Sequence, residues 1–434
     1  MAELPPRHIL SKSTFLRGCQ CVKSLWLYKN YYKLRDQPTT AQQRVFMQGT
    51  DVGLLARQLF GSGSDATPTD VFHYRESVRD TAKYIAEGQT VIFEAAFQYE
   101  GILCAVDILI KHKGKWYAYE VKSSTGVKSA FIQDASLQHY VITQSGLALE
   151  DFFIVHINAN YVRQGDLQLR ELFAKQSVKQ QAEGFQEFVA GKVNELKSIV
   201  SQQFMPSINT GNHCTNPYLC DFYSFCWKEK LKENVVETVK KVVHFDTENN
   251  WLQNCATPLY FLDINTYRVA VPGYDGHWPY RHVPFLFSLL KTETIDAAPS
   301  QQYFVAEMNT NPCLEFAENL INAIGNEGAI IVVERKFVVE RLKDLQKEYL
   351  HLAAALEKII SRIVELDNSQ KEHYIKTEQE KAKNLYSAED AAALWYNLRL
   401  DIYGFSNENE MKMIKQYHQN RTFDLLQIAI AKVG

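Results

Sequence analysis

The chain has 434 residues, of which 46% are hydrophobic and 22% are charged, and its formal net charge is −3. This length is enough for two or three domains, and the composition is typical of a globular protein. The charge excludes a basic surface over the whole molecule, so any contact with nucleic acid must come from a local patch. The sequence has no apolar stretch long enough for a signal peptide or a membrane span, which predicts a cytoplasmic protein without membrane contact. Eight cysteines in a reducing compartment then favour metal ligation over disulfides.

The first half of the chain alternates between helical and strand patterns. Apolar residues recur at helical spacing over 41–60, and 130–144 is predicted as a second helix. Short apolar segments predict strands at 90–97, 103–110, 116–121 and 152–157. This mixture predicts an α/β domain with a central sheet over residues 1–245.

The second half begins after a polar, helix-prone stretch. That stretch ends at Pro258, and a new apolar strand is predicted at 259–264. The change in pattern indicates a domain boundary and a second domain over 258–434. Within it, the region 340–380 is rich in Lys, Glu and Leu at helical spacing, which predicts long helices.

Two predicted strands of the first half carry a candidate metal site. A hairpin that turns at Lys113 and Gly114 places Asp107 opposite Glu120, with Cβ atoms about 4.5–5.5 Å apart. Two carboxylates this close repel each other, and a divalent cation between them would remove the repulsion. Lys122 lies two residues after Glu120 and therefore on the same face of its strand.

This arrangement suits hydrolysis of a phosphodiester. Mg²⁺ or Mn²⁺ held by Asp107 and Glu120 would polarise the phosphate and activate a water, and Lys122 would stabilise the developing charge. The backbone carbonyl of Val121 and the carboxylate of Glu94, on the preceding strand, are further candidate ligands. The alternative is a solvated hairpin with scattered charges, but an unpaired aspartate among apolar residues would be costly.

The residues around this pair resemble a known family. The run Cys104-Ala-Val-Asp107, followed by Glu120-Val-Lys122, is similar to the core of RecB-like PD-(D/E)XK nucleases, which implies a restriction-endonuclease-like fold. The resemblance implies that Gln138, on the helix after this core, orients substrate or water. Tyr140 follows at a tighter spacing than the family uses. Where relatives carry a histidine in the first helix, this chain has none, and Asp51 is the candidate replacement.

Three cysteines near the end of the first domain are regularly spaced. Cys214, Cys220 and Cys226 follow a Cys-x5-Cys-x5-Cys pattern, which indicates a soft metal centre that needs a fourth ligand. Cys21 is the candidate and Cys19 the second choice. The arrangement resembles the iron–sulphur subgroup of these nucleases, similar to the CRISPR-adaptation nucleases, which implies a [4Fe–4S] cluster that joins the two ends of the domain. Zinc is the alternative, with His213 as a further donor.

The second half resembles the C-terminal half of a bacterial family of uncharacterised two-domain proteins, with an RNase H-like, DnaQ-type exonuclease fold. The resemblance implies a site for two metals built from carboxylates, and this sequence departs from it. Asn265 and Arg421 stand where acidic residues are expected, and Glu365 is the candidate for a third acid. A positive Arg421 would repel metal ions. We therefore expect a degenerate exonuclease domain without metal catalysis, which binds nucleic acid or a protein partner or supports the first domain.

Together these features predict a metal-dependent nuclease that acts on DNA single strands or ends, in repair, recombination or defence. The alternative is a weakly active or inactive scaffold that keeps the nuclease fold and binds nucleic acid. RNA as the substrate is a third interpretation.

Overall fold

The computed structural model describes residues 4–228, 251–294, 297–307, 310–382, 387–399 and 407–430. The chain forms two compact units. Unit 1 consists of Met1–Pro38 and Phe46–Lys240, and unit 2 consists of Thr39–Val45 and Lys241–Gly434. No composition change or motif predicts that the short segment Thr39–Val45 groups with the second unit. None of the described helices has the length and apolar character that crossing a membrane requires.

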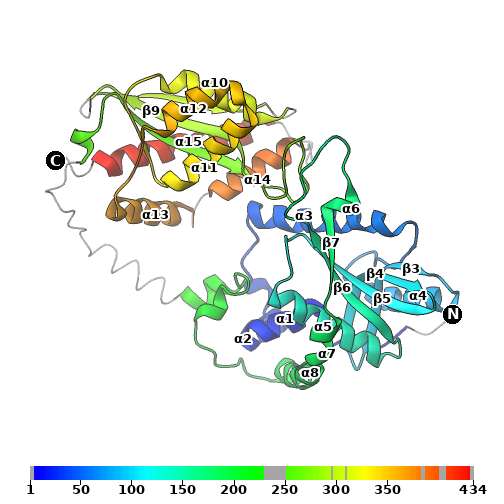
Figure 1. Ribbon diagram of the computed structural model, residues 1–434. Helices are drawn as coiled ribbons and strands as arrows, with labels where there is room; N and C mark the ends of the chain where they lie inside the picture. Colours follow the sequence, from blue (N-terminus) through cyan, green and yellow to red (C-terminus); the bar gives the residue numbers. More distant parts are fainter. Residues whose placement is uncertain are drawn as a thin grey trace. The chain divides into compact units, whose positions relative to one another are not determined.

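A mixed sheet forms the centre of unit 1 (Figure 1). In the described part of this unit the strand order is β2-β3-β4-β5-β6-β7, and β1 pairs with β4. The strands are β1 (Leu10–Ser11), β2 (Ser64–Asp65), β3 (Val91–Tyr99), β4 (Ile102–His112), β5 (Lys115–Lys122), β6 (Leu149–Ile157) and β7 (Phe173–Ser177). The helices are α1 (Lys12–Gln20), α2 (Val22–Asn30), α3 (Thr40–Arg57), α4 (Tyr74–Ala86), α5 (Ser129–Gln144), α6 (Leu169–Leu172), α7 (Lys179–Gly184) and α8 (Gln186–Ser201). The predicted helices and strands of this half are present, and the α/β class is confirmed.

The sheet of unit 1 forks along one side of β4. At one end of β4, the hairpin with β5 pairs Ile108 with Tyr119 in the predicted register. At the other end, β1 takes the place of β5 and pairs in parallel with Ile102 and Leu103. Asp107 therefore lies where β4 passes from one neighbour to the other. Backbone N–H and C=O groups at the point where the two neighbouring strands separate have no regular strand partner. Side chains can form hydrogen bonds with these groups instead.

The helix α5 covers the face of the sheet that carries Glu120. Side chains alternate along β5, so Trp116, Ala118 and Glu120 are buried on one face. Trp116 and Ala118 belong to the apolar core that also contains Leu137 and Val141 of α5. Glu120 is therefore buried because it lies on the same face of β5 as Trp116 and Ala118.

Unit 2 contains a second mixed sheet with the strand order β10-β9-β8-β11-β12. Its strands are β8 (Leu259–Tyr267), β9 (Val283–Thr292), β10 (Ser300–Val305), β11 (Ala329–Val332) and β12 (Ile363–Glu365). Its helices are α10 (Pro312–Ile324), α11 (Arg335–Glu348), α12 (Ala353–Ile360), α13 (Asn368–Ala382), α14 (Ala388–Arg399) and α15 (Asn407–Ile430). The long helices predicted for 340–380 are instead three helices interrupted by β12. Ile363 and Val364 of β12 pair in parallel with β11, and the helical spacing of this region did not reveal this strand.

Helices cover both faces of this second sheet, so β8 is buried on both sides. Leu262 and Ile264 pack into one apolar cluster, whereas Phe261 packs into another together with Leu425 of α15. By strand alternation Asp263 lies on the same face as Phe261, and it contacts α15. A polar group at this position is surrounded by protein and needs partners there.

We expect Gly328→Ala to unfold unit 2 far more readily than Gly276→Ala. Both glycines have positive φ, at 89° and 76°, so both substitutions carry backbone strain. A Cβ at Gly328 would in addition overlap the carbonyl oxygen of Pro258, whereas one at Gly276 meets open space. Overpacking of this kind costs about 1–3 kcal/mol or more. Chemical denaturation of both variants measures the difference, and equal losses of stability would contradict the close approach.

Candidate functional site

Three elements of unit 1 bring carboxylates together. Asp107 lies on β4 at the fork, Glu120 lies on β5, and Asp134 lies on the first turns of α5. Glu94 of β3 lies across from Asp107, because the register pairs the residues on either side of the two. We call these four residues the acidic cluster. The two candidate ligands predicted on the hairpin thus meet as the sequence predicted, together with acids from two other elements.

Basic and amide groups already occupy both carboxylate oxygens of Glu120. The Nζ atoms of Lys12 and Lys122 each lie 2.7 Å from Oε1, and Gln138 Nε2 donates to Oε2 at 2.9 Å. Burial of Glu120 raises its pKa, but the two lysines outweigh burial and hold the pKa well below its usual range. Glu120 is therefore ionised and compensated.

Asp134 completes the network from α5. Its Oδ2 lies 2.6 Å from Lys122 Nζ, and its Oδ1 accepts a hydrogen bond of 2.9 Å from Gln138 Nε2. Asp134 and Gln138 are four residues apart on α5 and so share one face of the helix. Gln138 thus connects two acids, whereas its own Oε1 is buried without a hydrogen-bond partner among the described residues. This unused acceptor leaves the network open to a further donor or to water.

Asp107 differs from the other acids, because among the described residues it makes no ion pair. Its Oδ2 accepts a 2.5 Å hydrogen bond from the backbone N–H of Val121, the group that the fork leaves without a strand partner. Removal from water and the nearby Glu120 carboxylate raise the pKa of Asp107 to about 8, and Lys12 offsets only part of this. The acidic cluster therefore lacks one positive charge at Asp107.

Glu94 adopts a backbone conformation that is unusual for its residue type. Its φ is 50°, in the left-handed region, which glutamate rarely adopts within a strand. Its carboxylate pairs with Arg57 Nη2 at 3.0 Å, and burial raises its pKa above the usual value. Arg57 thus holds Glu94 within the acidic cluster but already satisfies one of its carboxylate oxygens.

Three residues that form ion pairs in this region were not predicted. They are Lys12, Asp134 and Arg57, of which only Asp134 gave a local signal, through its spacing to Gln138.

Two further candidates have other surroundings. Tyr140 packs edge-on against Tyr99, with ring centroids 5.9 Å apart, because two residues along a helix turn a side chain to a different face. Asp51 is exposed on α3, whereas Arg57 of the same helix pairs with Glu94. The roles expected for Tyr140 and Asp51 stay predictions.

The four cysteines predicted as metal ligands line one cavity. Cys21, Cys214, Cys220 and Cys226 face it together with His213. Cys21 lies at the cavity because it is the single residue between two helices, the C-cap of α1 and the N-cap of α2. Burial raises the pKa of Cys21 and of Cys226, and the neighbouring thiols raise it further. Four thiolates can coexist there only with a positively charged centre among them.

Polar contacts hold the loop of Cys214 and Cys220 against α1. Gln20 Nε2 donates to the carbonyl oxygens of His213 and Tyr218 at 2.8 and 2.7 Å. Arg17 forms a two-point ion pair with Asp221, in which Nη2 donates to Oδ2 at 3.0 Å. The chain thus brings together positions almost two hundred residues apart without a covalent link.

The spacing of the thiols bears on which centre they fit. Among the described residues, His277, Cys313 and Glu348 are the one group of three such ligands whose donor atoms all lie within 4.8 Å of one another. The four thiols around the cavity do not form such a group of three among the described residues, so they are brought together less closely than those three ligands. Cys19 instead packs against the apolar core, so it is not the fourth ligand.

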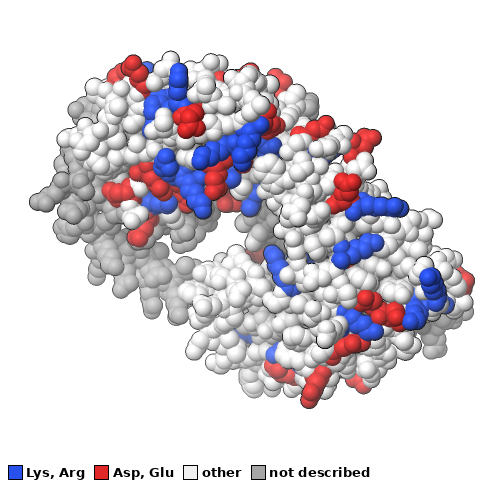
Figure 2. Space-filling view, viewed as in Figure 1, with Lys and Arg blue, Asp and Glu red and all other residues white. Residues whose placement is uncertain are grey.

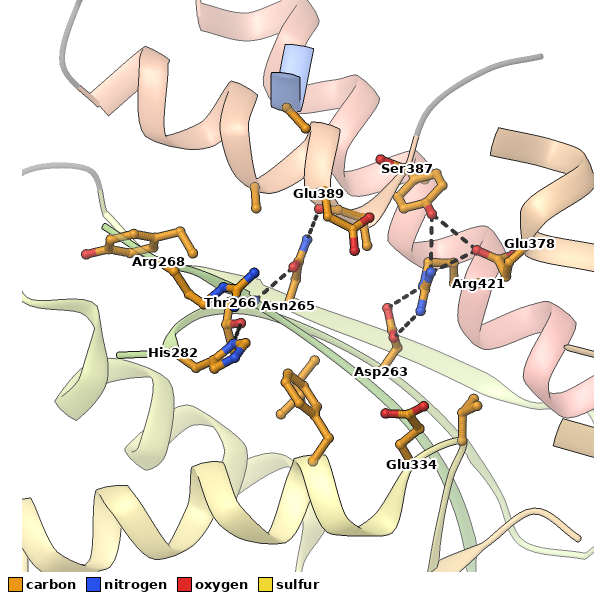
Figure 3. Close-up of a pocket in the computed structure, with 18 of the residues that line it drawn as sticks. Asp263, Asn265, Thr266, Arg268, His282, Glu334, Glu378, Ser387, Glu389 and Arg421 are labelled. Atoms are coloured by element: carbon orange, nitrogen blue, oxygen red, sulfur yellow. Dashed lines mark hydrogen bonds and ion pairs between the residues drawn. The ribbon is translucent and has the colours of Figure 1, made fainter. Parts of the chain in front are cut away.

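A cavity of about 570 Å³ in unit 2 contains the residues expected from the exonuclease resemblance (Figure 3). Arg421 lies between two acids there. Its Nε and Nη2 lie 3.1 Å from the two oxygens of Asp263, and its Nη1 lies 2.9 Å from Glu378. His418 Nδ1 lies 2.7 Å from Asp263, and Asn265 Nδ2 lies 2.9 Å from His418 Nε2.

The charge of Asp263 is thereby compensated. Burial raises its pKa, but Arg421 and His418 outweigh burial and lower the pKa to about 2. Glu365 does not line the cavity and instead pairs with Lys371 at 2.7 Å, so the expected third acid is elsewhere. Protein cations thus occupy the place that metal ions would need.

The group of His277, Cys313 and Glu348 is also occupied. Arg281 forms an ion pair with Glu348, and its Nη2 lies 3.9 Å from Cys313 Sγ. Arg281 is almost fully buried and cannot move into water without rearrangement of the core. Burial raises the pKa of Glu348, but His277 and Arg281 outweigh burial and lower it to about 2. A metal ion would have to displace a buried guanidinium here.

Replacing Asp107 by Asn is expected to stabilise the metal-free protein clearly more at pH 9 than at pH 5.5. The raised pKa means that the folded state binds an extra proton between about pH 4 and 8, so wild-type stability falls as the pH rises through this range. Asn keeps the acceptor for Val121 N–H and removes the charge. Because Asp107 is partly exposed, the gain should be on the order of 1–2 kcal/mol. Denaturant unfolding with a chelator measures it, and an equal effect at both pH values would contradict the shift.

Comparisons with known proteins cover parts of the chain. Residues 260–384, within unit 2, match the model of a family described as "Domain of unknown function (DUF2779)". No curated protein matches the sequence. A solved structure titled "Crystal structure of SSO0001" is 12% identical, and the match covers 52% of this chain and 89% of that chain with a TM-score of 0.28. A TM-score of this size establishes no shared fold.

Proposed function

We propose that unit 1 is a divalent-metal-dependent nuclease that hydrolyses phosphodiester bonds in DNA. The observation that carries the proposal is the carboxylate of Asp107, which has no cation partner among the described residues and is next to Glu120. A partly buried acid without a counter-ion costs stability, and a hard cation would remove that cost. Asp263 and Glu348 of unit 2 are each already paired with an arginine, which contrasts with Asp107.

The residues present fit Mg²⁺ or Mn²⁺. Asp107 and Glu120 offer hard oxygen ligands from adjacent strands, with Glu94 and the Val121 carbonyl nearby. When bound there, such a cation supplies the Lewis acidity that phosphodiester hydrolysis needs. Lys122 is held between Glu120 and Asp134 and presents its ammonium beside them, where it can stabilise negative charge on a phosphate. Gln138 fixes the orientation of Glu120 through its hydrogen bond.

Single strands or ends of DNA remain the proposed substrates. On the face drawn in Figure 2, the coloured Lys and Arg side chains lie among Asp and Glu over both units rather than in one broad basic surface. A net charge of −3 agrees with this mixture. Recognition by the phosphate backbone alone would therefore be weak, and the metal site itself would contribute much of the attraction. Repair, recombination or defence is the proposed setting.

The four cysteines around the cavity are proposed to hold a [4Fe–4S] cluster. Cys21, Cys214, Cys220 and Cys226 offer only soft thiolate donors, which suit iron–sulphur centres. The Cys-x5-Cys-x5-Cys pattern with a distant fourth cysteine resembles the iron–sulphur subgroup and favours this centre, with zinc as the alternative. Such a centre would tie the start of the domain to its end and restrict the unfolded chain over a long loop.

Unit 2 is proposed to be a degenerate exonuclease domain that performs no metal catalysis. The salt bridges of Arg421 to Asp263 and Glu378 support this, because they neutralise the acids that would face the cavity. Its proposed role is instead to bind a protein partner or nucleic acid, or to support unit 1.

Nuclease activity should depend on unit 1 alone. We expect Asp107→Ala and Glu120→Gln to lower the rate of Mn²⁺-dependent cleavage of labelled single-stranded DNA by at least about a hundredfold, since each removes a ligand of the proposed cation. Glu334→Gln is the matched control, because this exposed acid lines the cavity of unit 2 and should leave the rate unchanged.

Three outcomes of the cleavage assay separate the alternatives. Equal residual cleavage by wild type and Asp107→Ala would favour the inactive scaffold. Loss of cleavage in Glu334→Gln would instead place catalysis in unit 2. An RNA strand of the same sequence, tested in parallel, shows which nucleic acid is the substrate.

The cysteine centre is tested by its colour and by its effect on stability. Protein purified without oxygen should absorb visible light through thiolate-to-iron charge transfer, and Cys220→Ala should lose this absorption and much of the stability of unit 1. Removing a link across a long loop typically costs about 2–5 kcal/mol. Cys19→Ala is the control, since Cys19 packs in the core away from the cavity. A colourless protein that contains zinc would refute the cluster.

A further inference from the structure

Lys12 makes a contact that its own helix does not explain. It is the first residue of α1, where the backbone N–H groups point outward and a positive charge is unfavourable. Ser11 and Thr14 already cap this end of the helix through reciprocal hydrogen bonds. The reason for a cation at this position must therefore lie elsewhere in the fold, and the ion pair with Glu120 supplies it.

The position of Lys12 follows from the fork in the sheet. β1 pairs with β4 at Ile102 and Leu103, and α1 begins at the next residue. This connection delivers the Lys12 ammonium to Glu120 Oε1 at 2.7 Å and to Asp134 Oδ1 at 3.7 Å. Lys122 Nζ lies 2.7 Å from the same Oε1, so two ammonium groups share one oxygen.

Lys12 makes fewer close contacts than the other ammonium group. Lys122 makes two short ion pairs, at 2.7 and 2.6 Å, and its ammonium lies 5.6 Å from the ring centre of Phe131. Lys12 makes one short ion pair, and its second ion pair, to Asp134, is longer at 3.7 Å. The two side chains are similarly exposed, at 25% and 20%, so the number of short ion pairs is what distinguishes Lys12 as the ammonium with fewer contacts to give up.

We propose that Lys12 is the exchangeable counter-ion of the acidic cluster. Its ammonium neutralises Glu120 and Asp134 in the metal-free protein and moves to solvent when a divalent cation binds Glu120. This inference rests on the proposed function and deepens it, because it names a positioning residue that sets how tightly the site takes up its cation. Two cations that compete for one carboxylate are linked, so removing one must strengthen binding of the other.

The test is direct titration of Mn²⁺ by calorimetry at low ionic strength, with the full-length protein and no substrate. We expect Lys12→Met and Lys12→Gln to bind Mn²⁺ at least about tenfold more tightly than wild type, because each removes the competing charge. Lys12→Arg keeps the charge and should bind like wild type or more weakly. Lys115→Met is the matched control, since Lys115 lies on the same strand as Glu120 but pairs with Glu150.

A second readout uses thermal unfolding with and without Mn²⁺. The neutral variants should melt at a lower temperature than wild type in a chelator and gain more from Mn²⁺, whereas a purely structural role for Lys12 would lower both melting temperatures equally. Unchanged or weaker Mn²⁺ affinity in both neutral variants, with binding intact in wild type, would overturn the role of Lys12 alone. An absence of Mn²⁺ binding in every variant would overturn the proposed metal site and this inference with it.

Discussion

The constraint on which the rest of unit 1 depends is the carboxylate of Asp107, which makes no ion pair with any described residue and lies where two strands separate. β4 exchanges β5 for β1 along one side, and Asp107 lies at that exchange. Its carboxylate replaces a strand carbonyl as the acceptor for Val121 N–H. The sheet thereby keeps its hydrogen bonds satisfied while it holds a negative charge close to Glu120, and this arrangement is stable only if protons or cations balance it.

Three groups of acids in this protein show how such a balance differs. Asp263 and Glu348 in unit 2 are each paired with an arginine, and the pKa of each is lowered to about 2. Asp107 has no such partner among the described residues, and its pKa is raised to about 8. A guanidinium that is built into the fold is a permanent counter-ion, so the two groups in unit 2 have no need of a metal. Asp107 has no such permanent counter-ion among the described residues, and this difference is the basis of the metal site proposed in unit 1.

The sequence predicted the elements of unit 1 because strand alternation and helical spacing are local. The register that brings Asp107 to Glu120 followed from one turn, and the shared cavity of Cys21 with Cys214, Cys220 and Cys226 agrees with their spacing and resemblance. Contacts between distant elements were not predictable in the same way. Lys12 reaches Glu120 across 108 positions, and nothing near it in the chain indicates this. The helical spacing over 340–380 does not reveal β12, because a strand of three residues with only two apolar side chains carries no period of its own.

The helix α1 has Lys12 as its first residue and Cys21 directly after its last. Nine residues rise only about 14 Å, and an α-helix of this length bends little. The acidic cluster and the cysteine cavity are therefore connected by one short, stiff helix that has a residue of each site at its two ends. A rotation or translation of this helix at Cys21 moves the backbone of Lys12 by the same amount. The two sites thus share one rigid element, although their side chains and their chemistry are separate.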